Sequence, residues 1–363
     1  MKLQVTQENL AKALSIVARV ATNRGTLPVL ANVLIKTTGN RLAISATNLD
    51  IAITHHIGSK ISEEGSITVP ARLLQDFINT LPSGVIDIRL DDYKLRIKSG
   101  SYNSSINGIS AEDFPVMPAI KQEKPRILPN KQCRESLQQI VVAASNDDAR
   151  PVLTGVYIHT HEGNLYTVAT DSYRLAEKKI TTTKDDVSLL VPASAMQDLL
   201  RIVSDSDEDV EMYHDDQQVL FKVGEVELVT RLIDGNYPDY RKLIPEKFTS
   251  TARLQKQDFL NLTKIASLFA RESAGSIVVS VDESDGQVQV QSVASQLGEN
   301  SSKADAKVTG EGKITLNSRY LLDVLNVLKG NEVEFCFNGK LEPSLIRDPS
   351  DKDYKHVIMP LKS

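Results

Sequence analysis

The sequence contains a repeated unit of about 120 residues, and this repeat constrains the fold more than any other feature. The segment "VPARLLQDFINTLP" begins at Val69, and the related "VPASAMQDLLRIV" begins at Val191, 122 residues later. The segments "ATNLDIA" and "ATDSYRLA" place Thr47 and Thr170 123 residues apart. Two separate markers with nearly the same spacing indicate that one unit occurs at least twice.

A third copy is fainter. The segment "LNSRYLLDVLNVL" begins at Leu316, 125 residues after Val191. The final "VIMP" stands where the earlier copies have an aromatic residue before Pro115 ("EDFPVMP") or Pro238 ("DGNYPDY"). The period is far longer than that of solenoid repeats, so each copy is expected to be a domain. We place the domains at residues 1–124, 125–247 and 248–363, with charged, proline-containing linkers near 120–129 and 241–250.

The units share one order of predicted elements. In the first unit, Leu10, Leu14 and Val17 have the spacing of one helical face within residues 7–21, and a second helix with Leu74 and Ile78 on its apolar face follows the "VP" marker. Short alternating segments such as "RLAISATNLDIAIT", separated by polar turns, predict strands in hairpins. The expected fold class is therefore α+β, with three repeated domains that each contain two helices and antiparallel sheets.

The first helix of each unit also carries cationic residues opposite its apolar stripe. They are Lys12 and Arg19, then Lys131 and Arg134, then Lys264 and Arg271 opposite an expected stripe of Leu262, Ile265 and Phe269; Arg72, Arg201 and Arg319 lie near the other three helices. One such helix is most simply a solvated face. Recurrence in three units predicts a weakly cationic surface on an acidic protein.

Composition argues against several classes of protein. The net charge of −5 and the pI near 5.8 argue against a simple basic nucleic-acid-binding protein, although they allow a local basic surface. No stretch approaches the ~20 apolar residues that cross a bilayer, and the first residues do not resemble a signal peptide. Cys133 and Cys336 lie far apart and suggest neither a disulfide framework nor a metal site, so we expect a cytoplasmic protein.

Motifs for catalysis or metal binding are not found in the sequence. There is no phosphate-binding "GxxxxGK[ST]" and no "GxSxG" nucleophile motif. The segment "DSDEDVE" lacks the glycine of a calcium loop, and His159 and His161 lack a third ligand. We expect no catalytic residue, no metal and no cofactor. One alternative is a metal-dependent DNA-processing enzyme on a repeat scaffold, and another is an interaction scaffold that does not bind DNA.

Over its whole length the sequence resembles the β subunits of bacterial DNA polymerase III, the sliding clamps of DNA replication. The resemblance rests on "TLPVLANVLI", "TVPARLLQDF", "AEDFPVMP", "TVATDSYRLA", "LIDGNYPDYRKLIP", "LLDVLNVLKG" and the "VIMP" ending. It implies a non-catalytic processivity factor, catalogued with the DNA-directed DNA polymerase (a nucleotidyltransferase) that it serves. It also implies a head-to-tail homodimer that forms a ring around duplex DNA, and a heterologous interface can close in this way.

The resemblance further implies the partners. These are duplex DNA, bound without sequence specificity, and the replicative polymerase catalytic subunit, clamp loader, translesion polymerases, mismatch-repair proteins and ligase; a membrane is not among them. By position, Arg24, Arg72 and Arg150 match DNA-facing residues of the family. Leu268 and Phe269 match its dimer interface, and Leu268 lies on the Lys264 side of its helix, away from the core stripe. Because a ring retains DNA by enclosure, a few phosphate contacts suffice.

In this family, a hydrophobic cleft between the second and third domains binds short peptides from the partners. Carried over by position, its residues are Leu153, Thr170, Ser172, Tyr173, Arg174, Leu175, Pro238, Lys242, Leu243, Asn317, Tyr320, Leu341, Pro343, Val357, Ile358, Met359, Pro360 and Leu361. The "DSYR" segment replaces a Gly-His-Arg common in relatives, which implies a narrower pocket there. The alternative for Val357 and Ile358 is a buried final strand.

Overall fold

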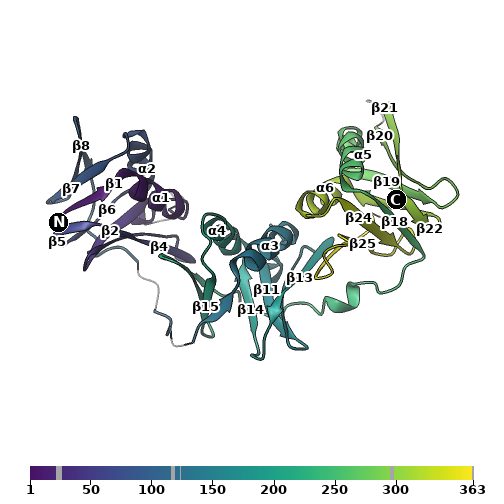
Figure 1. The fold of residues 1–363 in the computed structure, drawn as a ribbon, viewed down its shortest axis with the longest axis horizontal. Helices are drawn as coiled ribbons and strands as arrows, with labels where there is room; N and C mark the ends of the chain where they lie inside the picture. The colour runs from purple at the N-terminus through teal and green to yellow at the C-terminus, as the bar shows by residue number, and fades with distance from the viewer. Residues whose placement is uncertain (22–26, 116–118, 123, 295–297, 362–363) are drawn as a thin grey trace. The chain divides into compact units, whose positions relative to one another are not determined.

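The computed structural model describes residues 1–21, 27–115, 119–122, 124–294 and 298–361. The chain forms two compact units: unit 1 comprises Met1–Lys131 and Gln197–Leu232, and unit 2 comprises Gln132–Met196 and Ile233–Ser363. All strand pairs of the described residues are antiparallel, and six α-helices accompany them (Figure 1). The α+β class with two helices per repeat is therefore confirmed.

Unit 1 has two sheets. The first has the order β5 (Lys60–Glu63), β1 (Lys2–Thr6), β7 (Val85–Asp91), β8 (Lys94–Ser99), β9 (Tyr102–Asn107). The second has the order β10 (Arg126–Leu128), β15 (Val210–His214), β16 (Gln218–Val223), β17 (Val226–Arg231), β4 (Ile51–Gly58), β3 (Arg41–Thr47), β2 (Asn32–Thr38), β6 (Ser66–Pro70). In the second sheet, β17 of the second repeat pairs with β4 of the first, so one sheet spans two repeats.

Unit 2 also has two sheets. The larger has the order β14 (Ser188–Pro192), β11 (Gly155–His161), β12 (Asn164–Thr170), β13 (Arg174–Thr182), β26 (Tyr354–Ile358), β25 (Ser344–Arg347), β24 (Glu332–Phe337), β18 (Ser250–Gln255), β22 (Lys307–Thr309). The smaller has the order β21 (Gly298–Asp305), β20 (Gln287–Ala294), β19 (Ser276–Asp282), β23 (Gly312–Asn317). Here β13 of the second repeat pairs with β26 of the third. The second repeat is thus divided between the units because its sheets continue into different neighbours.

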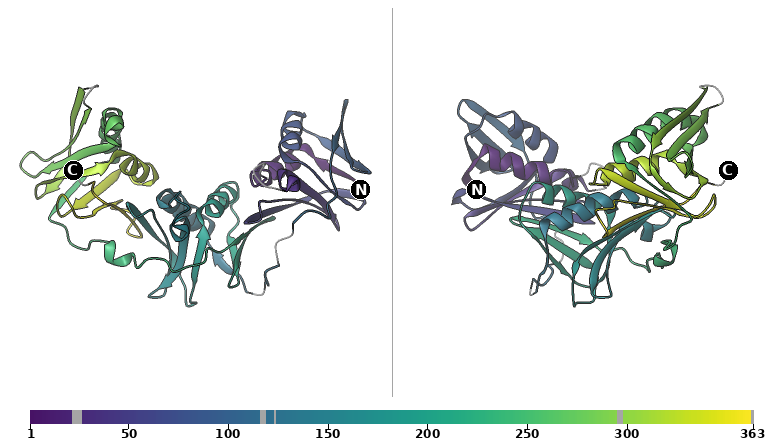
Figure 2. Two further views of the ribbon diagram at one scale, coloured as in Figure 1. Left: turned by 180° about the vertical axis from the view of Figure 1, so that it is seen from behind. Right: turned by 45° about the vertical axis from the view of Figure 1, so that its right-hand side comes forward.

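The helices lie against these sheets. In unit 1, α1 (Gln7–Val17) packs on α2 (Ala71–Thr80), and in unit 2, α5 (Lys256–Phe269) packs on α6 (Ser318–Val327), as Figures 1 and 2 show. The second repeat contributes α3 (Asn130–Ile140) and α4 (Ala193–Ser204). Helix α1 begins where the Thr6 side chain accepts a hydrogen bond from the Asn9 N–H, which satisfies one of the free N–H groups of the first turn. Its buried stripe of Leu10, Leu14 and Val17 agrees with the periodicity.

The predicted apolar stripe of α5 is wrong at one position. Phe259 and Ala266 are fully buried and Leu262 nearly so, but the Ile265 side chain is 44% exposed. Helix α5 packs on β20 and β21, and the face that it buries is formed by Phe259, Leu262 and Ala266, with Ile265 beside this face. Leu268 is 53% exposed, which confirms that it lies away from the core stripe.

Candidate functional site

The residues predicted to form the peptide site gather in unit 2, where β13 pairs with β26. Leu175 lies opposite Val357, and Arg174 lies opposite Ile358. On its other side, Ile358 pairs with Ser344 of β25, the residue that follows the predicted Pro343. The pairing therefore brings together segments that are far apart in the sequence.

The two apolar residues of the final strand belong to the core. The Val357 and Ile358 side chains are 1% and 0% exposed. Val357 packs in a buried cluster whose other members are Val168, Leu175, Tyr240, Cys336 and Leu345. The buried-strand alternative therefore describes Val357 and Ile358, and burial of this cluster stabilises the junction of the second and third repeats.

The residues after the strand differ, because Met359, Pro360 and Leu361 are only partly buried. Two backbone hydrogen bonds hold them: the Met359 N–H donates to the Tyr173 carbonyl at 2.8 Å, and the Leu361 N–H donates to the Thr315 carbonyl at 2.9 Å. The backbone of the tail is thus fixed while part of its apolar side-chain surface stays accessible. This is the arrangement that an anchored binding surface requires.

A tight turn carries the predicted residues between β12 and β13. The Thr170 hydroxyl donates to the Arg174 carbonyl at 2.6 Å, and Asp171 Oδ1 accepts from the Arg174 N–H at 2.9 Å. Ser172 has a φ of 76°, in the left-handed region that a non-glycine residue rarely adopts. The first repeat builds the same turn from Thr47, Asn48, Leu49 (φ 81°) and Ile51. The repeated "AT(N/D)" marker in the sequence therefore encodes this turn.

Arg174 connects this turn to the third repeat. Its Nε donates to Asp171 Oδ2 at 3.1 Å, its Nη1 donates to Asp323 Oδ2 at 2.5 Å, and its guanidinium carbon lies 4.4 Å from the centroid of the Tyr320 ring. Only 8% of the residue is exposed. Two carboxylates and a ring face satisfy the guanidinium, so Arg174 positions Tyr320 and the turn.

Other predicted residues supply exposed apolar or polar surface. Tyr173, Leu243 and Leu341 are among the most exposed large apolar side chains of the described chain. The other predicted residues of the peptide site have mixed environments: Leu153 is buried in the 3-10 helix Pro151–Leu153, Pro238 and Lys242 are exposed, Asn317 is the N-cap of α6, and Pro343 is partly buried. A hydrogen bond from Lys242 to Asp239 at 2.7 Å raises the pKa of the lysine.

A buried polar network beneath the Pro238–Leu243 segment was not predicted as part of the site. The Tyr240 hydroxyl donates to Glu177 Oε2 at 2.7 Å, and His159 Nε2 lies 2.9 Å from the same hydroxyl oxygen. Burial lowers the pKa of His159 and, together with Glu177, raises that of Tyr240. The other ring nitrogen, Nδ1, lies 3.4 Å from the Thr160 carbonyl, so the ring tautomer decides which of its two contacts His159 donates to. Arg241 and Lys355 also lie within 4 Å of the Glu177 carboxylate. Sequence reasoning singled out His159 only as a rejected metal ligand.

The candidate DNA-contacting residues have different environments. Arg72 is exposed in the first turn of α2 in unit 1. Arg150, in unit 2, donates from Nε to Asp147 Oδ2 at 3.1 Å and from Nη1 to Ser172 Oγ at 3.0 Å. Arg150 precedes the 3-10 helix Pro151–Leu153 and thus contacts the turn that carries the predicted peptide site. Arg24 lies outside the described residues.

The candidate dimer residues lie at the end of α5, which packs on β20 and β21. Leu268 is exposed and Phe269 is partly buried. Ile265, one turn before, is also exposed, although the periodicity assigned it to the core. Within the described residues, no cluster of three or more His, Cys, Asp or Glu side chains could hold a metal ion, and no helix is long and apolar enough to cross a membrane.

Comparison with known proteins covers the chain in three successive parts. Sequence models of the DNA polymerase III beta subunit match residues 1–118 (N-terminal domain), 127–239 (central domain) and 241–362 (C-terminal domain). The chain is similar to the beta sliding clamp of Synechocystis sp., with 31% identity over 100% of this chain and 99% of the relative. It is 29% identical to the beta sliding clamp of Bacillus subtilis, over the full length of both proteins.

Solved structures show the same fold. The DNA polymerase sliding clamp of Bacillus subtilis superimposes with a TM-score of 0.94 at 28% identity, over 100% of this chain and 99% of that one. A sliding clamp of Pseudomonas aeruginosa bound to griselimycin superimposes with a TM-score of 0.94 at 27% identity, over the whole of both chains. The similarity therefore extends through all three repeats.

Proposed function

This chain belongs to the DNA polymerase III beta subunit family, the sliding clamps, and we propose that it works as a ring-shaped homodimer that encloses duplex DNA and tethers replication and repair proteins to it. Its domains are 1–124, 125–247 and 248–363, and it acts in the cytoplasm as a non-catalytic processivity factor. The observation that carries the ring is the pattern of strand pairing between repeats.

Neighbouring repeats join where a strand of one repeat pairs with a strand of the next. The last strand of the second repeat's second sheet, β17, pairs with β4 of the first repeat, and the last strand of the third repeat, β26, pairs with β13 of the second. The equivalent strands without a neighbour are β9 in the first repeat and β21 in the third, and each forms the edge of its sheet. A second copy arranged head to tail would pair β9 of one protomer with β21 of the other, which also covers two exposed edges.

The helices support the same interface. Ile16, Gln139 and Ile265 are each the tenth residue of the first helix of a repeat. Ile16 lines a small hollow with Ile202 of α4, and Gln139 donates to Asp351 of the third repeat at 3.3 Å. In the first two repeats this position therefore faces the following repeat. Ile265 faces no other repeat among the described residues and is exposed, so we assign Ile265 to the dimer interface with Leu268 and Phe269.

DNA contact in this proposal comes from exposed cationic residues of the helices, among them Arg72, together with Arg24 and Arg150; these three arginines are carried over from the family. Peptides from the replicative polymerase, clamp loader, translesion polymerases, mismatch-repair proteins and ligase would bind the site around β13 and β26. Arg150 bonds Ser172 of that site, so a phosphate contact by Arg150 would compete with its contact to the peptide-site turn.

The decisive experiment measures retention on DNA together with oligomeric state. The chain should sediment as a dimer at micromolar concentration, and after loading by a clamp loader it should stay on nicked circular DNA and slide off the linearised form. Replacing Arg19 and Arg72 by Ala should make the salt dependence of DNA contact shallower, by roughly one counterion per lost phosphate contact. The control pair Lys36→Ala with Lys352→Ala, exposed residues outside the helices, should leave the salt dependence unchanged.

Two results would reject the proposal. A strictly monomeric chain with equal retention on both DNA forms would exclude the ring. Magnesium-dependent nuclease or polymerase activity that survives repurification and is lost on mutating an acidic residue would favour the metal-dependent enzyme instead.

A further inference from the structure

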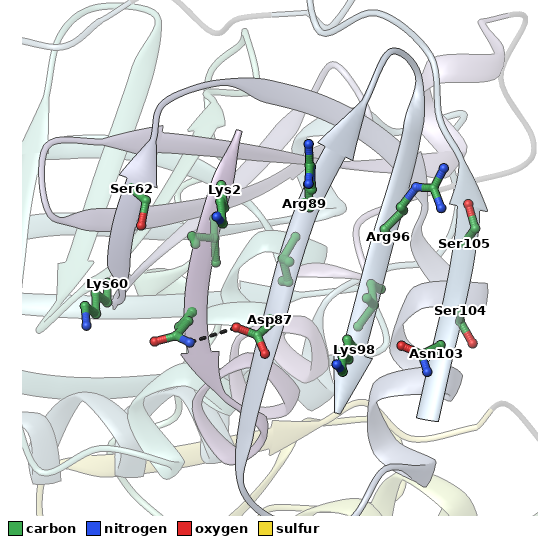
Figure 3. A pocket seen from close by; sticks show the side chains of 14 residues that line it. Lys2, Lys60, Ser62, Asp87, Arg89, Arg96, Lys98, Asn103, Ser104 and Ser105 are labelled. Atoms are coloured by element: carbon green, nitrogen blue, oxygen red, sulfur yellow. Dashed lines mark hydrogen bonds between the residues drawn. The ribbon is translucent and has the colours of Figure 1, made fainter. Parts of the chain in front are cut away.

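The five-stranded sheet of unit 1 has a hollow of about 650 Å³ on its solvent-facing side. Figure 3 shows the side chains that line it, rising from neighbouring strands. Five of the lining residues are cationic and one is acidic; the cationic residues are Lys2, Lys60, Arg89, Arg96 and Lys98, and the acidic one is Asp87. In a chain with a net charge of −5, this is a concentrated basic surface.

The strand register places three of these cations in one row. Lys2 lies opposite Arg89 across β1 and β7, and Arg89 lies opposite Arg96 across β7 and β8. Neighbouring strands are ~4.8 Å apart, so like charges directly opposite each other destabilise the sheet. Asp91 offsets part of this repulsion, because its carboxylate is 3.1 Å from Arg89 Nε and 2.5 Å from Arg96 Nε. One carboxylate shared by two guanidinium groups still leaves an excess of positive charge.

The adjacent row contains the other side chains of the hollow. Gln4 and Asp87 are neighbours across β1 and β7, and the Gln4 amide donates to Asp87 Oδ1 at 2.8 Å. Lys60 lies opposite Gln4, and Lys98 lies opposite Asp87. Neither lysine has an ion-pair partner among the described residues, so both ammonium groups are free to bind an external anion.

We propose that this basic hollow is a docking site for an acidic peptide segment that presents two or more closely spaced carboxylates. Its volume lies within the ~300–1,000 Å³ typical of sites for small ligands. A hollow of this size can hold a few peptide residues, but it is too small to hold a nucleic-acid duplex. Arginine forks and lysine ammonium groups bind carboxylates through charge-assisted hydrogen bonds, and Asn103 and Ser105 add neutral polar groups. The lining has no aromatic side chain on which a base could stack, which disfavours single-stranded nucleic acid.

This site is separate from the peptide site in unit 2 and from the helices proposed to contact DNA. All of its lining residues belong to unit 1, and three of them, Asn103, Ser104 and Ser105, are on β9, the strand proposed to pair with the second protomer. A partner with an acidic segment could contact the clamp here while its binding peptide occupies the other site.

The test uses the full chain and a fluorescein-labelled oligoglutamate peptide in an anisotropy titration. The peptide should bind, and its affinity should fall as salt is added, whereas the matching oligoglutamine peptide should not bind. Replacing Lys2 and Lys98 by Gln should weaken binding by at least about tenfold, because two of the five cations that line the hollow are lost. The matched pair Lys36→Gln with Lys124→Gln removes the same charge from exposed positions outside the hollow and should change the affinity by less than about twofold.

Several outcomes would overturn the proposal. If the Lys2/Lys98→Gln variant and the Lys36/Lys124→Gln control bind the peptide equally well, the peptide responds only to the overall charge of the protein. No binding by the unmodified chain would show that the hollow is unused by acidic peptides. Labelled oligothymidylate that binds more tightly than the peptide, and depends on Lys2 and Lys98, would assign the hollow to nucleic acid.

Discussion

The Tyr240 hydroxyl donates a 2.7 Å hydrogen bond to Glu177 Oε2, and this contact ties the segment that follows β17 to β13. Glu177 is 4% exposed, so its carboxylate depends on protein partners to replace water. The same segment carries Pro238, Lys242 and Leu243 of the predicted peptide site. This buried pair therefore fixes one wall of the predicted peptide site.

We expect Tyr240→Phe to weaken both the fold and the peptide site. The change removes one hydrogen bond from a buried carboxylate, which should cost about 1.5–3 kcal/mol of unfolding free energy. Peptide affinity should fall as well, because residues 238–243 lose their anchor. Urea denaturation and anisotropy with a labelled clamp-binding peptide measure the two effects. The control is Tyr93→Phe, an exposed tyrosine in the β7–β8 turn, and an equal effect of both changes would show that the network has no special role.

We expect Met359→Ala with Leu361→Ala to weaken peptide binding and to leave the fold intact. The backbone hydrogen bonds of both residues remain, while two partly exposed apolar side chains are removed. Full burial of one apolar side chain contributes about 1.5–3 kcal/mol, and Met359 and Leu361 are already partly buried before a peptide binds, so the affinity should fall by about one to three orders of magnitude.

A thermal melt and a sizing run on the same protein check its integrity, and Ile127→Ala, an exposed strand residue of unit 1, is the control. Unchanged peptide binding would remove Met359 and Leu361 from the site. Unfolding would instead make the whole "VIMPLKS" segment part of the core.

We expect Ile265→Ser with Leu268→Ser to convert the dimer to a monomer. Both side chains are about half exposed in the single chain, so polar replacements cost little within the protomer. Loss of their burial should raise the dissociation constant of each interface by about two orders of magnitude or more. Analytical ultracentrifugation across a concentration series gives the result, with Ile127→Ser as the matched control. A variant that dimerises as tightly as the control would place the interface elsewhere.

We expect the free energy of unfolding to decrease as the pH falls below about 6.5, the ordinary pKa of histidine. Burial lowers the pKa of His356 to about 3 and that of His55 to about 4, and also lowers that of His159. The unfolded chain therefore binds protons that the folded chain does not. Each buried histidine of this kind lowers the free energy of unfolding by about 2 kcal/mol between about pH 6.5 and pH 5.

Denaturation at several pH values tests this dependence. Replacing His356, which is fully buried, by Gln should reduce the slope of stability against pH, whereas His214→Gln, at an exposed position, should not. A stability that is constant between pH 7 and pH 5 would show that these rings can be protonated in the folded protein.

The sequence by itself determined the repeat, the order of elements and the local turns. The offset between Thr47 and Thr170 is visible because both residues build the same turn, in which a hydroxyl and an Asx side chain bond the backbone within four residues. Helix α1 was predictable because its cap at Thr6 and its apolar spacing are short-range properties of the chain.

Only the tertiary structure decided which strands join and which apolar side chains stay outside the core. Val357 lies opposite Leu175 although 182 residues separate them, and no local pattern specifies that register. Ile265 has the spacing of a core residue, yet it is exposed because the core face of α5 is set by the sheet beneath it. The cations at Lys2, Arg89 and Arg96 are scattered in the sequence, and strand pairing alone brings them into one row, because cross-strand neighbours are fixed by hydrogen bonding rather than by distance along the chain.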